Sequence, residues 1–365
     1  DVDPLVEHEF HQFLRHSARV RNITILSTSN YFHLLTTLPI KTCVFPNLRS
    51  LSWLVLCTEI GDLRFFLPPT LRRCYVSEEL HLDMKYIGPR CPDMEEFIVH
   101  GGSSGVRLSE TLRSCKRLRH LQCPPFDSAA WMHLSTIPTL LEVKIYTLRM
   151  INVHYPLDNL DFATFLHLTT LSLSGGIEAA SAVAIIQHFK FPSFKEFEMR
   201  VHEHTSDSLM AVRQFFCFKE LRTLKLYFHR PIYFDDDLFF EAMTNWPHIH
   251  SLSLVNWDSS PATVTFRGLF AALRLCPQLQ DLQVLVDARN IDIEPEVESF
   301  QHTSLRYLTV DSCGLEAVNV ETVARIIYSM LPAVNRVMCG VPRLWHDVNK
   351  HLDMLRNKPS SAPEA

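Results

Sequence analysis

The chain has 365 residues, of which 47% are hydrophobic and 21% charged, with a formal net charge of −5. This composition excludes a mostly disordered chain, and the acidic balance argues against a nucleic-acid binder, which normally carries a basic face. The apolar runs are far shorter than the ~20 residues that cross a bilayer, so we expect neither a membrane span nor a membrane partner.

The first predicted element is a cap helix over about residues 5–17, where Leu5, Phe10 and Leu14 contribute to an apolar stripe. After it a nine-residue segment recurs along the chain: large apolar, Pro, any, Leu, any, any, Leu, any, Leu or Val. Clear copies of this segment are residues 45–53 (FPNLRSLSW), 137–145 (IPTLLEVKI), 246–254 (WPHIHSLSL) and 276–284 (CPQLQDLQV).

The recurring segments define a regular repeat. If the first Leu-type position of each copy is called the anchor, thirteen anchors run from Val20 to Val334 at a mean spacing of about 26 residues. The positions three and five residues after each anchor are apolar, as in a strand with one buried face. A proline two residues before the anchor, as at Pro92, ends the preceding helical pattern and starts the turn into the strand.

These patterns predict an α/β fold: a curved leucine-rich-repeat solenoid of about 13 repeats, with parallel strands on the concave face and helices on the convex face. A C-terminal cap helix is expected over about residues 343–356, and residues 357–365 have the composition of a disordered tail. The predicted leucine-rich-repeat domain spans residues 1–356.

The N-terminal repeats carry a family resemblance. Residues 10–25 (FHQFLRHSARVRNITI) resemble the segment that follows the F-box in mushroom-type (basidiomycete) fungal F-box proteins, in which a helix leads into a first strand of the pattern Ala-x-x-Val-Arg-x-Leu. This chain departs from that pattern, since Ala18 lies two residues before Val20 and Ile23 replaces the leucine. Residues 45–51 (FPNLRSL) and 91–97 (CPDMEEF) resemble later repeats of the family.

The resemblance implies the substrate-binding part of a receptor of a cullin-type ubiquitin ligase. Family members bind a Skp-type adaptor through the F-box and hold the target on the repeats. The F-box does not occur in this sequence, so adaptor binding is expected only through a segment outside it. The alternative is a free-standing interaction or inhibitor protein with no ligase link.

An enzyme with a site in the concavity is the third hypothesis, and its candidate motifs are weak. His202 and His204 are spaced like strand-end metal ligands, but no third ligand is visible. The run Asp235 to Asp237 is better explained as an acidic helix N-terminus than as a cation site. Residues 101–105 and 174–176 are glycine-rich but lack a nucleotide-binding motif. We therefore predict no catalytic, cofactor or metal site.

The ten cysteines show no C-x-x-C spacing and occupy apolar positions, so we expect small buried side chains and a cytoplasmic or nuclear location.

The concave face is the predicted binding surface for a protein target. The residue between the last two apolar positions of each strand should point there, which places Ser253 in a solvated row and Leu254 in the core. This row consists of Thr24, Ser52, Tyr75, Ile98, Gln122, Lys144, Ser172, Glu198, Lys225, Ser253, Gln283, Thr309 and Met338. The row and its flanks are polar and dotted with Tyr and Arg, which are frequent interface anchors. The predicted partner-binding residues are His100, Tyr146, Glu198, Arg200, Lys225, Tyr227 and Trp257.

Overall fold

The structure is a computed structural model, and the parts of the chain that it describes form an α/β solenoid. The described residues are 7–26, 43–54, 63–77, 84–100, 105–146, 163–175, 179–201, 212–228, 234–256, 263–294, 299–310, 315–339 and 342–357. The chain divides into two compact units, Asp1–Ser193 and Phe194–Ala365, called unit 1 and unit 2 below. Thirteen parallel strands follow one another in chain order, as the repeat predicts.

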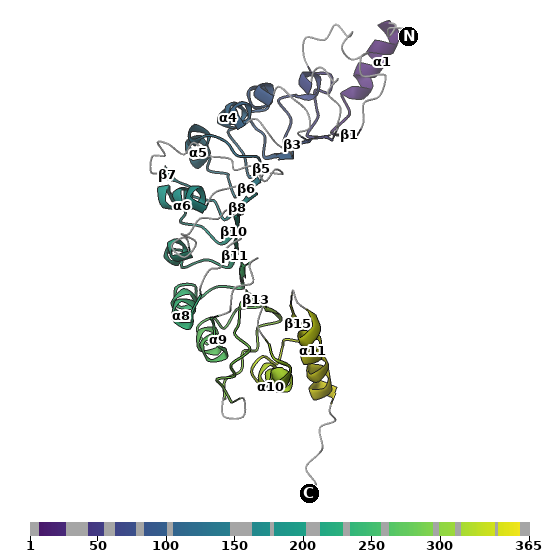
Figure 1. Ribbon diagram of the computed structural model, residues 1–365. Coiled ribbons are helices and arrows are strands. Elements are labelled where there is room, and N and C mark those ends of the chain that lie inside the picture. The colour runs from purple at the N-terminus through teal and green to yellow at the C-terminus, as the bar shows by residue number, and fades with distance from the viewer. Residues whose placement is uncertain are drawn as a thin grey trace. The chain divides into compact units, whose positions relative to one another are not determined.

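Unit 1 contributes seven of these strands and covers them with helices on one side (Figure 1). The strands are β1 (Asn22–Ile25), β2 (Ser50–Trp53), β3 (Arg73–Ser77), β4 (Glu96–His100), β5 (His120–Cys123), β6 (Glu142–Tyr146) and β8 (Thr170–Ser174). The helical segments are α1 (Glu7–Ser17), η1 (Leu63–Phe66), η2 (Met84–Tyr86), α3 (Ile87–Arg90), α4 (Gly105–Ser114), α5 (Ser128–Ser135) and α6 (Ala179–His188). A separate two-stranded sheet pairs β7 (Ala163–Thr164) with β9 (Phe189–Lys190).

Unit 2 contributes six strands, with helices along one side and a final helix past the last strand (Figure 1). The strands are β10 (Glu196–Val201), β11 (Thr223–Phe228), β12 (Ser251–Asn256), β13 (Asp281–Val284), β14 (Tyr307–Val310) and β15 (Val337–Met338). The helical segments are η3 (Phe215–Cys217), α8 (Asp236–Asn245), α9 (Phe266–Leu273), η4 (Ala317–Asn319), α10 (Val320–Met330) and α11 (Pro342–Asn357). In each unit, the sheet face opposite these helices is called the open face.

Alternation along the strands builds the core. In β6, for example, Val143 and Ile145 are fully buried, whereas the residues on either side of them are partly exposed. The same two positions are buried in every other strand except at the chain ends, where Ile23 and Cys339 are partly exposed. Because burying one such side chain contributes roughly 1.5–3 kcal/mol, stacking of repeats supplies stability that no single repeat has.

A tight turn precedes most strands, and proline often occupies its second position. The amide of Leu279 donates to the carbonyl of Cys276 (3.0 Å) across the turn that holds Pro277. The fixed φ of proline suits this position of a β-turn. The next repeat lacks the proline, and the buried ring of His302 bonds the turn instead. His302 Nδ1 accepts from the Leu305 amide (3.1 Å), and its Nε2 bonds the Cys276 carbonyl of the preceding repeat (3.0 Å).

The entry to most strands is held by a shared carbonyl. The oxygen of Arg222 accepts from the amides of His250 (2.7 Å) and Ser251 (3.1 Å) in the following repeat, and Arg21 plays the same part in unit 1. Repetition of this three-centre contact keeps successive strands in register, so that equivalent side chains align across the sheet.

The last strand is finished by a side chain of α11. Asn349 is 9% exposed; its Oδ1 accepts from the amide of Val337 (2.9 Å) and its Nδ2 donates to the Val337 carbonyl (2.9 Å). The amide group therefore replaces the next strand, which is how an otherwise open edge is closed. The two predicted cap helices correspond to α1 and α11.

Candidate functional site

The predicted row of open-face residues exists as a continuous line of cross-strand neighbours in each unit. In unit 1 the register aligns Thr24, Ser52, Tyr75, Ile98, Gln122, Lys144 and Ser172. In unit 2 it aligns Glu198, Lys225, Ser253, Gln283, Thr309 and Met338. Most of these side chains are partly exposed. The repeat pattern was therefore sufficient to place every member of the row.

The first strand of unit 2 carries an arginine that is held from two sides on the open face. Arg200 Nε donates to Glu198 Oε1 (2.9 Å), and the Arg200 guanidinium lies over the Tyr227 ring, 4.5 Å from its centroid. Arg200 and Tyr227 are register neighbours on β10 and β11. Within the described residues, the terminal nitrogens of Arg200 have no hydrogen-bond partner, so the fork that suits a carboxylate is available to a ligand.

Lys225 lies beside Glu198 in register, but the next residue of the row differs from expectation. Ser253 is only 5% exposed, and its hydroxyl donates to Gln283 Oε1 (2.7 Å). The expectation of a solvated Ser253 is therefore wrong. The physical reason is its small size between two long side chains, those of Lys225 and Gln283, one of which bonds it. Leu254, at 6% exposure, is in the core as predicted.

The unit 1 face carries an aromatic cluster that joins three strands. His100 on β4 lies between Tyr75 on β3 and Tyr146 on β6, with ring centroids 4.7 and 5.4 Å away. All three side chains are half-buried. His100 and Tyr146 were predicted from the sequence, but Tyr75 was only one member of the row. Its contact with His100 depends on side-chain direction, which the repeat pattern does not specify.

A proline explains why Tyr146 reaches across β5. In this sheet the carbonyl five residues after an anchor accepts from the amide six residues after the next anchor, as Ile25 does from Leu54 (2.8 Å). The equivalent donor for Val99 on β4 would be residue 124, which is proline and has no N–H. The Tyr146 hydroxyl donates to the Val99 carbonyl instead.

This bond determines the proton arrangement on His100. The Tyr146 oxygen lies 2.5 Å from His100 Nδ1, and its single proton is given to Val99, whose carbonyl can only accept. With that proton on Val99, the tyrosine oxygen accepts from His100 Nδ1, so the contact favours the tautomer that carries its proton on Nδ1. Burial holds the pKa of His100 below its usual value of 6.5, so at pH 7 Nε2 is an unprotonated acceptor.

Charged side chains flank the cluster on β5 and β6. Glu142 Oε2 lies 3.0 Å from His120 Nδ1, and Glu142 Oε1 lies 2.6 Å from Lys144 Nζ. Burial alone would raise the pKa of Glu142, but the bonds from Lys144 and His120 lower it below its usual value. The carboxylate and the lysine therefore largely neutralise each other beside Tyr146.

The acidic run at residues 235–237 forms a helix N-terminus, as expected. Asp235 caps α8 by accepting from the Leu238 amide (2.9 Å). Asp236 accepts from the amide (2.7 Å) and the hydroxyl (2.8 Å) of Thr265, the N-cap of α9. These carboxylates thus join the N-termini of successive helices.

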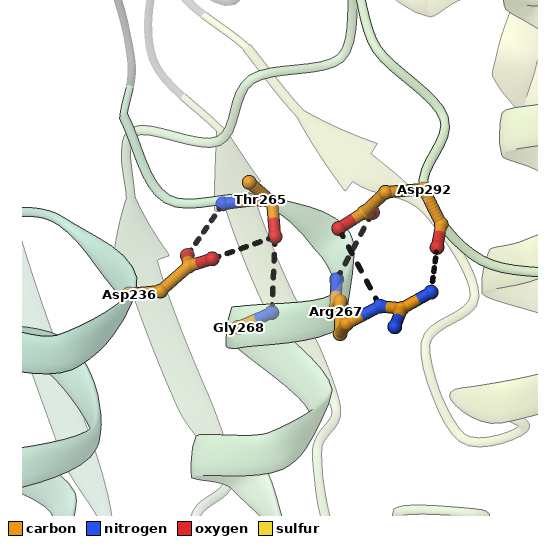
Figure 2. Close-up of polar contacts among 5 residues, drawn as sticks. All are labelled: Asp236, Thr265, Arg267, Gly268 and Asp292. Carbon is orange, nitrogen blue, oxygen red and sulfur yellow. Dashed lines mark hydrogen bonds and ion pairs between the residues drawn. The ribbon is translucent and has the colours of Figure 1, made fainter.

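Figure 2 shows how this contact continues into the next repeat. The Thr265 hydroxyl accepts from the Gly268 amide (3.1 Å), and a Cβ at position 268 would collide with the Asp236 carboxylate. Arg267 donates through its amide to Asp292 Oδ1 (3.2 Å) and through its guanidinium to the Asp292 carbonyl (2.7 Å). The cluster therefore positions helices through satisfied contacts.

The described cysteines and the glycine after β8 have local structural surroundings. Of the cysteines that the structure describes, five are buried, whereas Cys217 is exposed. Burial raises the pKa of Cys91 and of Cys115 to about 12, so both remain thiols at pH 7. Within the described ranges there is no group of three or more His, Cys, Asp or Glu arranged to hold a metal ion. Gly175 follows β8 at φ 97°, a loop conformation that favours glycine.

Several predicted residues lie outside the described residues. They are Trp257, the motif of His202, Glu203 and His204, positions 101–104, Gly176, residues 5–6 of the first predicted cap helix and residues 358–365 of the predicted tail, whose first residue, Asn357, ends α11 instead.

The chain was compared with protein-family models and with curated proteins, and neither comparison finds a match. Among the helices described, none is long and apolar enough to cross a membrane.

Proposed function

We propose that the chain is a protein-recognition module that binds a target protein on the open face of its sheet. The observation that carries this proposal is the arrangement of Glu198, Arg200 and Tyr227. Arginine and tyrosine dominate the binding energy of many protein interfaces. An arginine already held by an ion pair and a ring loses less side-chain entropy on binding, so more of its interaction energy contributes to affinity.

The free terminal nitrogens of Arg200 favour an acidic group on the target. They form a planar donor pair that matches the two oxygens of a carboxylate. Glu198 neutralises part of the positive charge of Arg200. The chain without a target is therefore more stable than it would be with an unpaired arginine on this face. Lys225, next in register to Glu198, adds a second positive charge to the same face.

The narrower proposal is the substrate-binding part of an F-box receptor of a cullin-type ubiquitin ligase, acting in the cytoplasm or nucleus. It is supported by the resemblance of residues 10–25, in which helix α1 leads into strand β1 in the order that the family shows. A free-standing interaction or inhibitor protein is the alternative. Co-purification of a Skp-type adaptor with the full-length gene product that contains this chain supports the ligase proposal, and its absence favours the alternative.

The experiment that tests target binding compares variants of matched surface arginines. Proteins are captured from cells on the wild-type chain, on Arg200→Ala, and on Arg325→Ala as the control. Arg325 lies on α10 in an ion pair with Glu321 (2.6 Å), and its side chain is 54% exposed, against 50% for Arg200.

A true target is bound by the wild type and by Arg325→Ala and is lost from Arg200→Ala. With the target purified, we expect Arg200→Ala to raise the Kd roughly thirtyfold, the equivalent of about 2 kcal/mol. If every captured protein binds Arg200→Ala as well as the wild type, this face is not the binding surface.

A further inference from the structure

The aromatic cluster of unit 1 offers two features that its own contacts leave unused. The first is Nε2 of His100, an acceptor at pH 7 with no hydrogen-bond partner among the described residues. The second is the ring of Tyr75, which no Arg or Lys in that part of the chain covers. The rings of Tyr86 and Tyr227, by contrast, each carry an arginine, from Arg64 at 5.4 Å and Arg200 at 4.5 Å.

Aromatic faces and a lone pair share a preference for a cationic donor. The face of a tyrosine ring attracts an ammonium or guanidinium group, and a neutral imidazole nitrogen accepts a hydrogen bond from the same group. Within the cluster, a carboxylate would be repelled by the lone pair of Nε2 and by the electron-rich ring faces, and would find a donor only in the Tyr75 hydroxyl. The cluster is therefore matched to positive charge and opposed to negative charge.

We infer that the cluster of Tyr75, His100 and Tyr146 binds a basic side chain of the target protein, a lysine or an arginine, by cation–π contact with Tyr75 and a hydrogen bond to His100 Nε2. This inference rests on the proposed function, because it names what the open face of unit 1 recognises. Tyr146 positions His100 by its contact with Nδ1, which leaves Nε2 as the ring nitrogen for the ligand.

The charges around the cluster permit a bound cation. On β3 and β4 the charged residues of this face, Arg73 and Glu96, are register partners of opposite sign and lie four residues before Ser77 and His100 along their strands. On β5 and β6 the Lys144 ammonium is bound to Glu142, which His120 also contacts. The opposite charges balance closely, so the rings and Nε2 decide the preference.

The inference is tested without the target, using n-butylammonium as a mimic of a lysine side chain. Butyrate of the same length is the anionic control at constant ionic strength. The His100 ring signals are followed by NMR at pH 7.5 in the full chain. We expect a saturable shift with butylammonium and none with butyrate.

Two Tyr75 variants and a pH series complete the test. Tyr75→Leu should raise the Kd for butylammonium about three- to fivefold, whereas Tyr75→Phe keeps the ring face and should bind as the wild type does. Protonation of Nε2 removes the acceptor and repels the cation. The apparent Kd of the wild type should therefore rise, by up to about tenfold per pH unit below the pKa of His100.

Two results would overturn the inference: equal shifts with butyrate, or a butylammonium affinity that depends neither on pH nor on the Tyr75 ring. The pH series uses the wild type alone and so remains decisive if Tyr75→Leu does not fold. Either result would leave target capture through Arg200 unaffected, and loss of that capture would leave butylammonium binding intact.

Discussion

Arg200 and Tyr227 meet as register neighbours on adjacent strands of unit 2, whereas His100 and Tyr146 of unit 1 meet across an intervening strand. In unit 2 the side chains stack directly because consecutive repeats align them. In unit 1 the contact exists because Pro124 removes a backbone donor and a tyrosine hydroxyl takes its place. One face is thus assembled by the regularity of the repeat and the other by an interruption of it.

The comparison shows two ways in which a solenoid builds a surface from identical units. A regular stretch positions side chains through backbone register, and its function depends on which residues occupy the row. In an interrupted stretch, a side chain forms the hydrogen bond that a backbone group would otherwise lack. That bond fixes the position of the side chain and of the residues that contact it. Asn349 in unit 2 is a second case of the latter, since it completes the hydrogen bonds of Val337 at the last strand.

The comparison assumes that buried and open-face residues alternate along the strands in the same way in both units. A charge placed in the core tests this assumption, and we expect it to have the largest effect on the free energy of unfolding. Leu173→Asp should destabilise unit 1 by about 4 kcal/mol or more, because it buries an unpaired carboxylate and removes packing. Ser172→Asp, one residue earlier and beside Lys144, should stay within about 1 kcal/mol of the wild type. Urea unfolding measures both, and equal losses would mean that the alternation is misplaced.

The side chain that completes the last strand should matter almost as much. Asn349→Leu keeps the size of the side chain and leaves the N–H and C=O of Val337 without partners. We expect a loss of about 2–4 kcal/mol in the free energy of unfolding. Asn357→Leu, at an exposed position of the same helix, is the control and should be nearly neutral. A loss as small as that of the control would show that water forms the hydrogen bonds to the N–H and C=O of Val337 in the variant.

Removal of the two tyrosine hydroxyls distinguishes the two faces directly. Tyr146→Phe should cost about 1–3 kcal/mol because Val99 loses its partner, whereas Tyr227→Phe should cost little. If Pro124 is the cause, Pro124→Ala supplies the missing N–H, and Tyr146→Phe should be less costly in that background. A double-mutant cycle in urea measures this coupling. Strict additivity would contradict the explanation.

The smallest effect concerns pH. The pKa of His100 is lower in the folded chain than its ordinary value of 6.5, so below that value the unfolded chain binds more protons at this site. The contribution of His100 to stability is therefore intact above pH 6.5 and declines as the pH falls toward the lowered pKa. Between pH 7.5 and 5.5 the wild type should lose more stability than His100→Gln. An equal loss in the two proteins would contradict the assignment.

Local sequence was sufficient to predict the repeat, because its signals are carried within a few residues. Period-two alternation identified the strands, proline identified the turns, and the spacing of the anchors predicted the solenoid. Once register was assumed, the open-face row followed, and with it the placement of Arg200 and Tyr227 on adjacent repeats of the same face. The preference for a helix N-terminus at residues 235–237 had the same local origin.

The tertiary structure alone decided the contacts that combine distant residues. The tautomer of His100 depends on a proline and a tyrosine of later repeats, and the use of Tyr75 depends on where its ring turns. The burial of Ser253 depends on the lengths of its neighbours Lys225 and Gln283. The physical reason is that periodicity specifies only the face on which a side chain lies. Its hydrogen-bond partners and protonation depend on which donors and acceptors nearby still need a partner, and its exposure depends on the size of its packed neighbours.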